Sequence, residues 1–328
     1  MSKKGKIFLS WSAAAIVLFV NTAALAAEKW PERPIRLVVG YAPGGATDVI
    51  ARAVAKGLTD SMGQTVIVEN KPGANSNIAA DQVARATPDG YTLLFGTIST
   101  ATNASVYHAK DYNMEKDLTP VAPIAMVPNI LVVNAKSPIK SVQDYVAYAK
   151  AHPGELTFAS AGTGSSIHLS GELFKKAAGV DMLHIPYRGS GPAMTDLLAG
   201  TVMSSFDNLP SALPHIQAGS LRALGVTSNK RDPHLPDVQT IEEQGITGYN
   251  AYAWFGLFAP AGVSDGIVKI INTHIKQILG TAEFQAQLEN LGGQDMYMPQ
   301  SEFRVFVLNE VKKWGAVIDD VGLRQPSQ

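Results

Sequence analysis

Short apolar runs alternate with amphipathic stretches along the first part of this chain. Ile35–Val39 is a largely apolar run that leads into a glycine-containing loop, as expected of a buried strand, and Ile50, Val54 and Leu58 follow at helical spacing. Gly63 marks the expected end of this helix. Further strands are predicted at residues 65–69 and 91–95, with a helix over residues 77–86 between them. This order of elements predicts a parallel sheet with helices on both faces.

The same order of elements repeats in a second block. Ser141 followed by Asp144 is typical of a capping box, which predicts a helix over Val142–Ala151. The other elements predicted in this block are strands at residues 130–133, 156–159, 183–187, 202–206 and 221–226 and helices at residues 166–178 and 192–199. After the block come a strand at residues 253–258 and two helices, at residues 267–279 and 303–321, whose apolar positions recur every three or four residues.

The two blocks predict an α/β chain folded into two lobes. The first lobe is expected to be discontinuous, made of residues 27–130 and 228–328, and the second to span residues 131–227. Two crossings of the chain between the lobes would form a hinge and a central cleft. Because ligands of open α/β sheets bind outside the carboxyl ends of the strands, the loops that follow the strands are the candidate sites.

The N-terminal segment has the pattern of a secretory signal peptide. Lys3, Lys4 and Lys6 precede a short apolar run over residues 13–20, and a small-x-small tripeptide ends at Ala26. The run is too short for a stable membrane span, and no later stretch approaches the ~18 uninterrupted apolar residues that a span needs. We therefore expect an exported protein, with residues 1–26 removed by cleavage near Ala26. The alternative is an uncleaved N-terminal anchor.

Charge and cysteine content narrow the functional classes. Without residues 1–26 the chain has 24 basic and 28 acidic residues, a net charge of −4, which argues against nucleic acid or an anionic membrane surface as a partner. An anionic ligand would then need local hydrogen-bond donors rather than bulk positive potential. The absence of cysteine excludes thiol catalysis, thiolate metal sites and a lipid-anchored cysteine, and it is compatible with an oxidising compartment.

Two glycine loops, one in each block, are the main candidates for anion binding. Glycines let the backbone approach a ligand closely, and the helix that follows presents unpaired N–H groups with a partial positive charge. In the first loop, Thr47 or Asp48 is expected to cap the helix. The candidate ligand-binding residues are Gly45, Ala46, Thr47 and Asp48 in the first loop and Gly162, Thr163, Ser165, Ser166 and His168 in the second. The alternatives are a turn that merely requires glycine, a well-capped helix, and a supporting role for His168.

Polar residues after other strands supply further candidates. They are Ser76, Asn77, Thr97 and Ser99, uncharged residues that suit the orientation of a small polar ligand. Ordinary turn and cap chemistry is the alternative for each of them. Asp207 would repel an acid, but it would accept a hydrogen bond from a hydroxyl or amino group, or brace its own loop. Arg188 either reaches an anionic ligand or makes a surface or hinge contact.

An enzyme is the less favoured class. A serine hydrolase would use Ser165 or Ser166 with His168, but a serine and a histidine at the start of one helix give poor triad geometry, and the Gly-x-Ser-x-Gly motif is missing. The 7 histidines show no metal-ligand spacing, and the first strand is not followed by the glycine fingerprint of a dinucleotide site. We expect no catalysis, no metal and no cofactor.

The motifs of the chain, taken in order, resemble the Bug family of periplasmic solute receptors, which are the TctC receptors of tripartite tricarboxylate transporters. The similarity runs from residue 30 to residue 318. It is carried by Pro43-Gly44-Gly45 with Asp48, residues 68–74 (Val-Glu-Asn-Lys-Pro-Gly-Ala), residues 88–94 (Pro-Asp-Gly-Tyr-Thr-Leu-Leu), His168-Leu169 with Gly171-Glu172-Leu173-Phe174, Leu221-Arg222-Ala223-Leu224, Leu235-Pro236-Asp237-Val238 and Trp254-Phe255-Gly256-Leu257.

The resemblance implies a two-lobed, periplasmic-binding (Venus-flytrap) fold and a location in the periplasm. Members of the family grip one carboxylate of the ligand through backbone N–H groups and ordered waters, and residues 45–48 and 162–166 match the loops that do so. We therefore expect a monomer that captures a small organic carboxylate (a di- or tricarboxylate, an aromatic acid or an amino acid). The implied partners are the small and large integral membrane subunits of a transporter. The alternative is a receptor for a membrane signalling partner.

The chain departs from the family pattern at a few positions. Gly40 stands where the family often has proline, Asn75 and Ser76 replace a common glycine pair, and Arg188 replaces a frequent lysine. Because the first two departures lie near the expected cleft, the resemblance does not identify the ligand.

Overall fold

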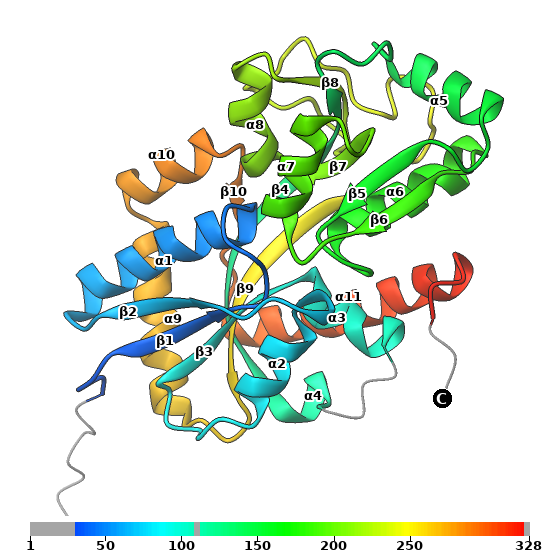
Figure 1. Ribbon diagram of the computed structural model, residues 1–328. Helices are drawn as coiled ribbons and strands as arrows, with labels where there is room; N and C mark the ends of the chain where they lie inside the picture. Colours follow the sequence, from blue (N-terminus) through cyan, green and yellow to red (C-terminus); the bar gives the residue numbers. More distant parts are fainter. Residues whose placement is uncertain (1–29, 108–111, 325–328) are drawn as a thin grey trace, which may run out of the picture. The chain divides into compact units, whose positions relative to one another are not determined.

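The computed structural model describes residues 30–107 and 112–324, and Figure 1 shows the order of their helices and strands. The predicted signal peptide, residues 1–26, lies outside the described residues and stays a prediction. None of the helices in the described part of the chain is long and apolar enough to cross a membrane.

The first group of strands begins with the predicted parallel sheet. β1 (Ile35–Val39) lies between β2 (Val66–Asn70) and β3 (Thr92–Thr97) and pairs with both of them in parallel. The far side of β3 pairs antiparallel with β9 (Tyr252–Pro260), which pairs antiparallel with β4 (Leu118–Asn134). The parallel prediction is therefore correct for the first three strands, and β9 and β4 make the sheet mixed.

The second group of strands repeats this arrangement. β5 (Thr157–Ser160) lies between β6 (Leu183–Pro186) and β7 (Ser204–Asn208) and is parallel to both. β7 and β8 (Leu221–Val226) then pair antiparallel with β4. Each group thus has a parallel part whose carboxyl ends lead into loops or directly into helices, followed by antiparallel strands.

β4 belongs to both groups of strands. Its first part pairs with β9 and with the short β10 (Gln294–Asp295), and its second part, from Asn129 onward, pairs with β7 and β8. Only residues 130–133 of this strand were predicted, because Pro120, Pro123 and Pro128 interrupt its apolar pattern and remove backbone donors. The register of β4 against β9 shifts next to Pro120 and Pro123, which is how the strand accommodates them.

Helices cover the first group of strands (Figure 1). α2 (Asn77–Ala84), α3 (Ile98–Val106) and α11 (Gln300–Asp320) pack on the face of the sheet that carries Val38 and Leu94. α1 (Ala46–Met62) packs against α9 (Asp265–Leu279) and against β1, β2 and β3. The other helices in this part of the described chain are η1 (Ala74–Ser76), α4 (Met114–Asp117) and α10 (Ala282–Asn290).

Helices also cover the second group of strands. α5 (Val142–Ala151) and α6 (Ser166–Ala178) share one core with β4, β5 and β7, and α7 (Ser190–Ala199) and α8 (Leu209–Gln217) share another. The predicted capping box of α5 is confirmed in part, since the Ser141 hydroxyl accepts a hydrogen bond from Asp144 N at 3.0 Å, while the Asp144 carboxylate accepts from Lys140 N instead of Ser141 N. The sequence did not predict α8, because two prolines lie within its nine residues.

The segment between β8 and β9 packs with the second group of strands. Ile241, Tyr249 and Ala251 are buried in the same core as Tyr145 and Phe206. The predicted division of the chain at residue 228 stays a prediction, and we propose that the return to the first lobe lies at β9 instead.

Candidate functional site

The first glycine loop leads from β1 into α1. Gly45 occupies the N-cap position, and no side chain caps the helix. The predicted cap at Thr47 or Asp48 is wrong, because the two glycines let the chain turn early enough for α1 to begin at Ala46. Thr47 and Asp48 therefore lie in the first helical turn. Among the described residues, none accepts a hydrogen bond from the backbone N–H of Ala46, Thr47 or Asp48.

Asp48 holds this loop together from inside the helix. Its carboxylate accepts hydrogen bonds from Gly44 N at 3.2 Å and Asn70 Nδ2 at 3.0 Å and forms an ion pair with Arg52 Nη2 at 2.9 Å. Burial raises the pKa of Asp48, but the bonds from Arg52, Asn70 and Gly44 outweigh burial and hold the pKa below its ordinary value. The negative charge is thus compensated within the loop.

The second glycine loop leads from β5 into α6 and is tied down by side chains. Gly162 N donates to Ser160 Oγ at 3.1 Å, and Gly164 N donates to His168 Nδ1 at 3.0 Å. Ser165 is the N-cap, and its hydroxyl accepts from His168 N at 3.3 Å. The backbone N–H groups of the two glycines are therefore engaged within the protein and are not donors for a ligand.

Further unengaged donors lie at the start of α6. None of the described residues accepts a hydrogen bond from the backbone N–H of Ser166 or Ile167. The second loop therefore offers amide hydrogens in the same way as the first, from the first turn of the helix that follows it.

His168 supports the second loop from behind. Its ring is buried, and because Nδ1 accepts from Gly164 N, the hydrogen of the neutral ring is on Nε2, which lies 3.6 Å from Glu172 Oε1. The ring stacks on that of His184 at a centroid distance of 3.7 Å. Burial is the main cause that lowers the pKa of His184 to about 2, and the charge of Lys175 contributes less. His184, which reaches the loop from β6, was not predicted from the sequence.

The two loops meet at one small cavity. Thr47 from the start of α1 and Ser165 and Ser166 from the start of α6 line it, together with Ile98 at the start of α3 and Asn208 just before α8. Four helix N-termini, each with a partial positive charge, thus converge on one space. The cavity of about 20 Å³ has room for roughly one water molecule, so its walls must move apart before an organic acid enters.

The wall of the cavity holds no cationic side chain. One part is polar and the rest apolar, including two aromatic rings. The lining residues are Tyr41, Thr47, Thr97, Ile98, Ala161, Ser165, Ser166, Ile167, Asn208, Ala253 and Phe255. An anion in this space would be held by amide hydrogens and hydroxyls, as the net charge of the chain led us to expect.

Tyr41 belongs to a buried polar network that the sequence did not predict. Its hydroxyl donates to Asn75 Oδ1 at 2.9 Å, and Asn75 Nδ2 donates to Asn103 Oδ1 at 3.1 Å. Asn75 lies in η1, where Ala74, Asn75 and Ser76 all have positive φ, at 44°, 50° and 70°. Three successive non-glycine residues in this region store backbone strain, a feature that is common at functional sites.

The structure places the predicted residues in three groups. Those that line the cavity are Thr47, Thr97, Ser165 and Ser166. Those in the loops or helix starts beside the cavity are Gly45, Ala46, Asp48, Ser99, Gly162 and Thr163. Those that lie outside its wall are Ser76, Asn77, His168, Arg188 and Asp207. Within the described chain, Asn77 Oδ1 is buried without a hydrogen-bond partner.

Asp207 and Arg188 support the cavity indirectly. Asp207 is fully buried and accepts hydrogen bonds from Ser190 Oγ at 2.7 Å, Ser211 Oγ at 2.6 Å and Asn208 N at 2.7 Å. Burial raises the pKa of Asp207 more than these bonds lower it. The side chain of Arg188 is exposed, and its backbone carbonyl accepts from Ala42 N at 3.0 Å, which joins the two groups of strands.

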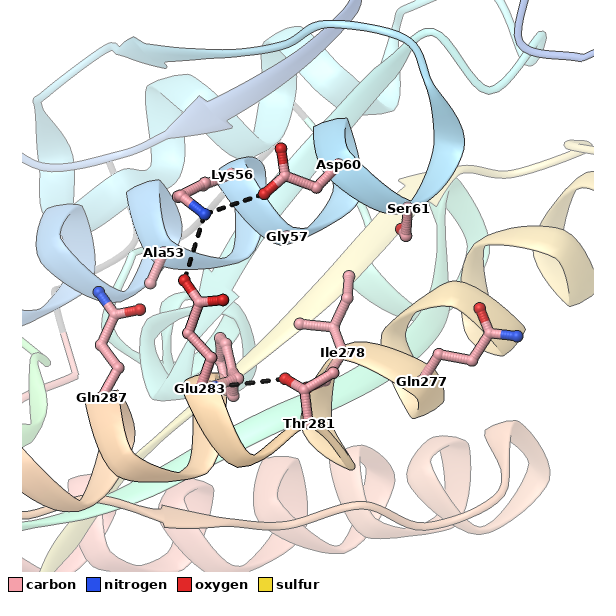
Figure 2. A pocket seen from close by; sticks show the side chains of 11 residues that line it. Ala53, Lys56, Gly57, Asp60, Ser61, Gln277, Ile278, Thr281, Glu283 and Gln287 are labelled. Carbon is pink, nitrogen blue, oxygen red and sulfur yellow. Dashed lines mark hydrogen bonds and ion pairs between the residues drawn. The ribbon is translucent and has the colours of Figure 1, made fainter.

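A larger hollow of about 270 Å³ lies between α1 and the α9–α10 turn (Figure 2). Lys56 at its rim pairs with Asp60 at 2.9 Å and with Glu283 at 3.3 Å. These three charged side chains are mostly exposed and satisfy one another, and the hollow shares no residue with the cavity between the loops. The smaller cavity is therefore the better candidate. The described residues contain no group of three or more side chains placed to hold a metal ion.

Two groups of strands that share β4, with a glycine loop from each at one cavity, are typical of a two-lobed binding protein. Solved structures agree. Rpa4515 of R. palustris, solved with adipate, has a TM-score of 0.87 and 39% sequence identity over 89% of this chain and 98% of its own. The periplasmic binding protein BugD has a TM-score of 0.87 and 33% identity over 90% and 100% of the two chains. The predicted fold class is confirmed.

The family follows from the sequence comparisons. The profile described as "Tripartite tricarboxylate transporter family receptor" (TctC) matches residues 50–323. Protein BugT of Bordetella pertussis is 38% identical over 317 residues, which cover 95% of this chain and 97% of BugT. The chain belongs to the TctC family of receptors, and the resemblance found in its motifs is confirmed.

Proposed function

We propose that this protein is a periplasmic receptor that captures a small organic carboxylate and delivers it to the small and large membrane subunits of a tripartite tricarboxylate transporter. The observation that carries the proposal is the convergence of four helix N-termini on a cavity without a lysine or arginine in its wall. Such a space favours a compact anion that accepts several hydrogen bonds at once.

The free energy available at these donors is sufficient. A hydrogen bond to a charged group contributes roughly 1.5–3 kcal/mol, and a helix N-terminus adds ~0.3–1 kcal/mol, or up to ~2 kcal/mol when partly buried. Three or four such donors reach the ~8 kcal/mol of micromolar binding after part of the association cost is subtracted. Membership of the TctC family and the adipate in Rpa4515 support a carboxylate as the ligand.

Binding without catalysis is the function that the geometry favours. His168 is the histidine next to Ser165 and Ser166, but its Nδ1 accepts from Gly164 N and its Nε2 faces Glu172. Neither ring nitrogen is placed to take a proton from a serine hydroxyl, as a hydrolase requires. We therefore expect the ligand to be released unchanged.

Thermal-shift screening of an acid library with the mature protein, followed by calorimetry on the hits, tests this function. We expect 1:1 binding of a carboxylate, no binding of the corresponding primary amide, and full recovery of the acid after incubation. Binding of amides as tight as that of acids would contradict the anion site. Consumption of the ligand would indicate an enzyme.

A further inference from the structure

Three buried side chains form a hydrogen-bond relay that ends at the cavity wall. The Tyr41 hydroxyl donates to Asn75 Oδ1 at 2.9 Å, and Asn75 Nδ2 donates to Asn103 Oδ1 at 3.1 Å. Asn103 Nδ2 in turn donates to the backbone carbonyl oxygen of Asn75 at 3.0 Å. The three residues are 6%, 4% and 1% exposed, so water does not compete for these bonds.

The direction of the relay is set by that backbone carbonyl, which accepts and cannot donate. The Asn103 atom that faces it must be the amide nitrogen, which makes Asn103 Oδ1 the acceptor for Asn75. Asn75 must then turn its nitrogen toward Asn103 and its oxygen toward Tyr41. Tyr41 has to be the donor in the last bond. Because burial raises the pKa of Tyr41 to about 12, its hydroxyl keeps that hydrogen at neutral pH.

Packing prevents Asn75 from turning away. A Cβ atom on Gly40 would lie 1.8 Å from Ser76 Oγ, so Ser76 fills the space that the glycine leaves. On the other side, a Cβ on Gly162 would lie 3.5 Å from Asn75 Cα, so the second glycine loop closes against Asn75. The strained left-handed backbone of η1 is held in place between these contacts.

The relay decides what Tyr41 offers to a ligand. Its hydrogen is engaged by Asn75, so the phenol oxygen presents lone pairs. Thr97, which lines the cavity with Tyr41, has its hydroxyl oxygen 3.4 Å from this oxygen and closer, at 2.8 Å, to Ser99 Oγ. A carboxylate oxygen placed against Tyr41 would meet lone pairs, whereas a hydroxyl or ammonium group would find an acceptor.

We propose that Tyr41, oriented by Asn75, makes the site selective for acids that carry a hydrogen-bond donor, such as hydroxy or amino acids, over the unsubstituted acids. This inference rests on the proposed function as a carboxylate receptor. The helix N-termini hold the carboxylate, and Tyr41 accepts from the second group of the ligand. One neutral hydrogen bond changes the dissociation constant by about tenfold.

Calorimetry with acids that differ by one hydroxyl tests the selectivity. The probes are succinate and malate, butyrate and 3-hydroxybutyrate, and benzoate and 4-hydroxybenzoate. For every pair that binds, the hydroxylated acid should bind about tenfold more tightly, and Tyr41→Phe should bring the ratio close to one. Tyr148→Phe, a change on α5 away from the cavity, is the matched control and should keep the wild-type ratio.

Asn75→Gly provides an independent second variant. Glycine accepts the φ of 50° without strain, so folding is retained while the acceptor for Tyr41 is lost. Tyr41 is then free to donate, and we expect the unsubstituted acids to gain affinity relative to the hydroxylated ones. Equal affinities within each pair, or ratios unchanged by both variants, would overturn the selectivity and leave the receptor function standing. Failure of these six acids and of every other acid in the library to bind would overturn both.

Discussion

Replacing Gly191 by alanine tests whether closure of the two lobes depends on a close contact between backbone atoms of the two lobes. Gly191 is the second residue of α7 and does not have a positive φ, so alanine fits the helix locally. Its Cβ, however, would lie 2.3 Å from the backbone carbonyl oxygen of Pro43 in the first glycine loop. A backbone oxygen cannot rotate out of the way as a side chain does, so the loops must separate.

The magnitude follows from these two opposite effects. Alanine in place of glycine stabilises a helix by up to ~1 kcal/mol, while overpacking of this kind costs roughly 1–3 kcal/mol. Only the closed arrangement is destabilised by the overpacking. Separation of the loops also breaks the 3.0 Å hydrogen bond from Ala42 N to Arg188 O. We expect an unchanged or slightly higher Tm, and a ligand dissociation constant raised about 5- to 150-fold at 1.4 kcal/mol per tenfold.

Calorimetry with the tightest acid of the library gives the dissociation constant, and differential scanning calorimetry gives the Tm. Gly266→Ala is the matched control, because Gly266 is also the second residue of its helix, α9, and its nearest contact for a Cβ is 3.9 Å away. This control should leave binding unchanged. A wild-type dissociation constant in Gly191→Ala, or a fall in Tm without loss of affinity, would refute closure through this contact.

Two carboxylates give the remaining predictions. Asp48→Ala should lower the free energy of unfolding by about 2–3 kcal/mol, because hydrogen bonds to a charged group are lost, and should weaken ligand binding. Asp60→Ala, an exposed change on the same helix, is the control and should lower the free energy of unfolding by less than ~1 kcal/mol. Equal effects of the two variants in denaturation and calorimetry would contradict this prediction. The raised pKa of Asp207 means that the folded state holds its proton more tightly, so its contribution to stability falls as pH rises from 3.8. Asp207→Asn should therefore gain stability relative to wild type between pH 4 and 7, and a pH-independent difference would count against it.

Much of the fold was readable from local pattern. The parallel strands β1 to β3 and β5 to β7, the helices α1, α5 and α6, and the capping serine at 141 all follow from apolar spacing and from residues next to each other in the chain. The helices α3, α4 and α10 were missed although they contain no proline. Most of β4 and all of α8 were missed because they contain prolines. Proline breaks the local pattern, while neighbouring strands and helices in the folded chain still stabilise the element.

The candidate site was only half readable. Glycine loops before helices indicate amide donors, and Thr47, Ser165 and Ser166, which were predicted on that basis, line the cavity. Their role in binding stays a prediction. Tyr41, Asn75 and His184 were not predicted from the sequence. Their hydrogen-bond partners, in the same order, are Asn75, Asn103 and Ser160, which lie 34, 28 and 24 residues away in the chain. No local signal predicts a contact across such separations.

The sequence by itself determined the family and the alternation of strands and helices, and it predicted that amide hydrogens rather than cations hold the ligand. Only the tertiary structure decided which backbone N–H groups are free, since those of Gly162 and Gly164 donate to Ser160 Oγ and His168 Nδ1. It also decided that Tyr41 must donate to Asn75, since that direction depends on one backbone carbonyl. A hydrogen bond needs two partners, and in this network its direction is fixed by an acceptor that cannot donate. Because these partners are distant in the sequence, neither the pairing nor the direction is known until the chain has folded.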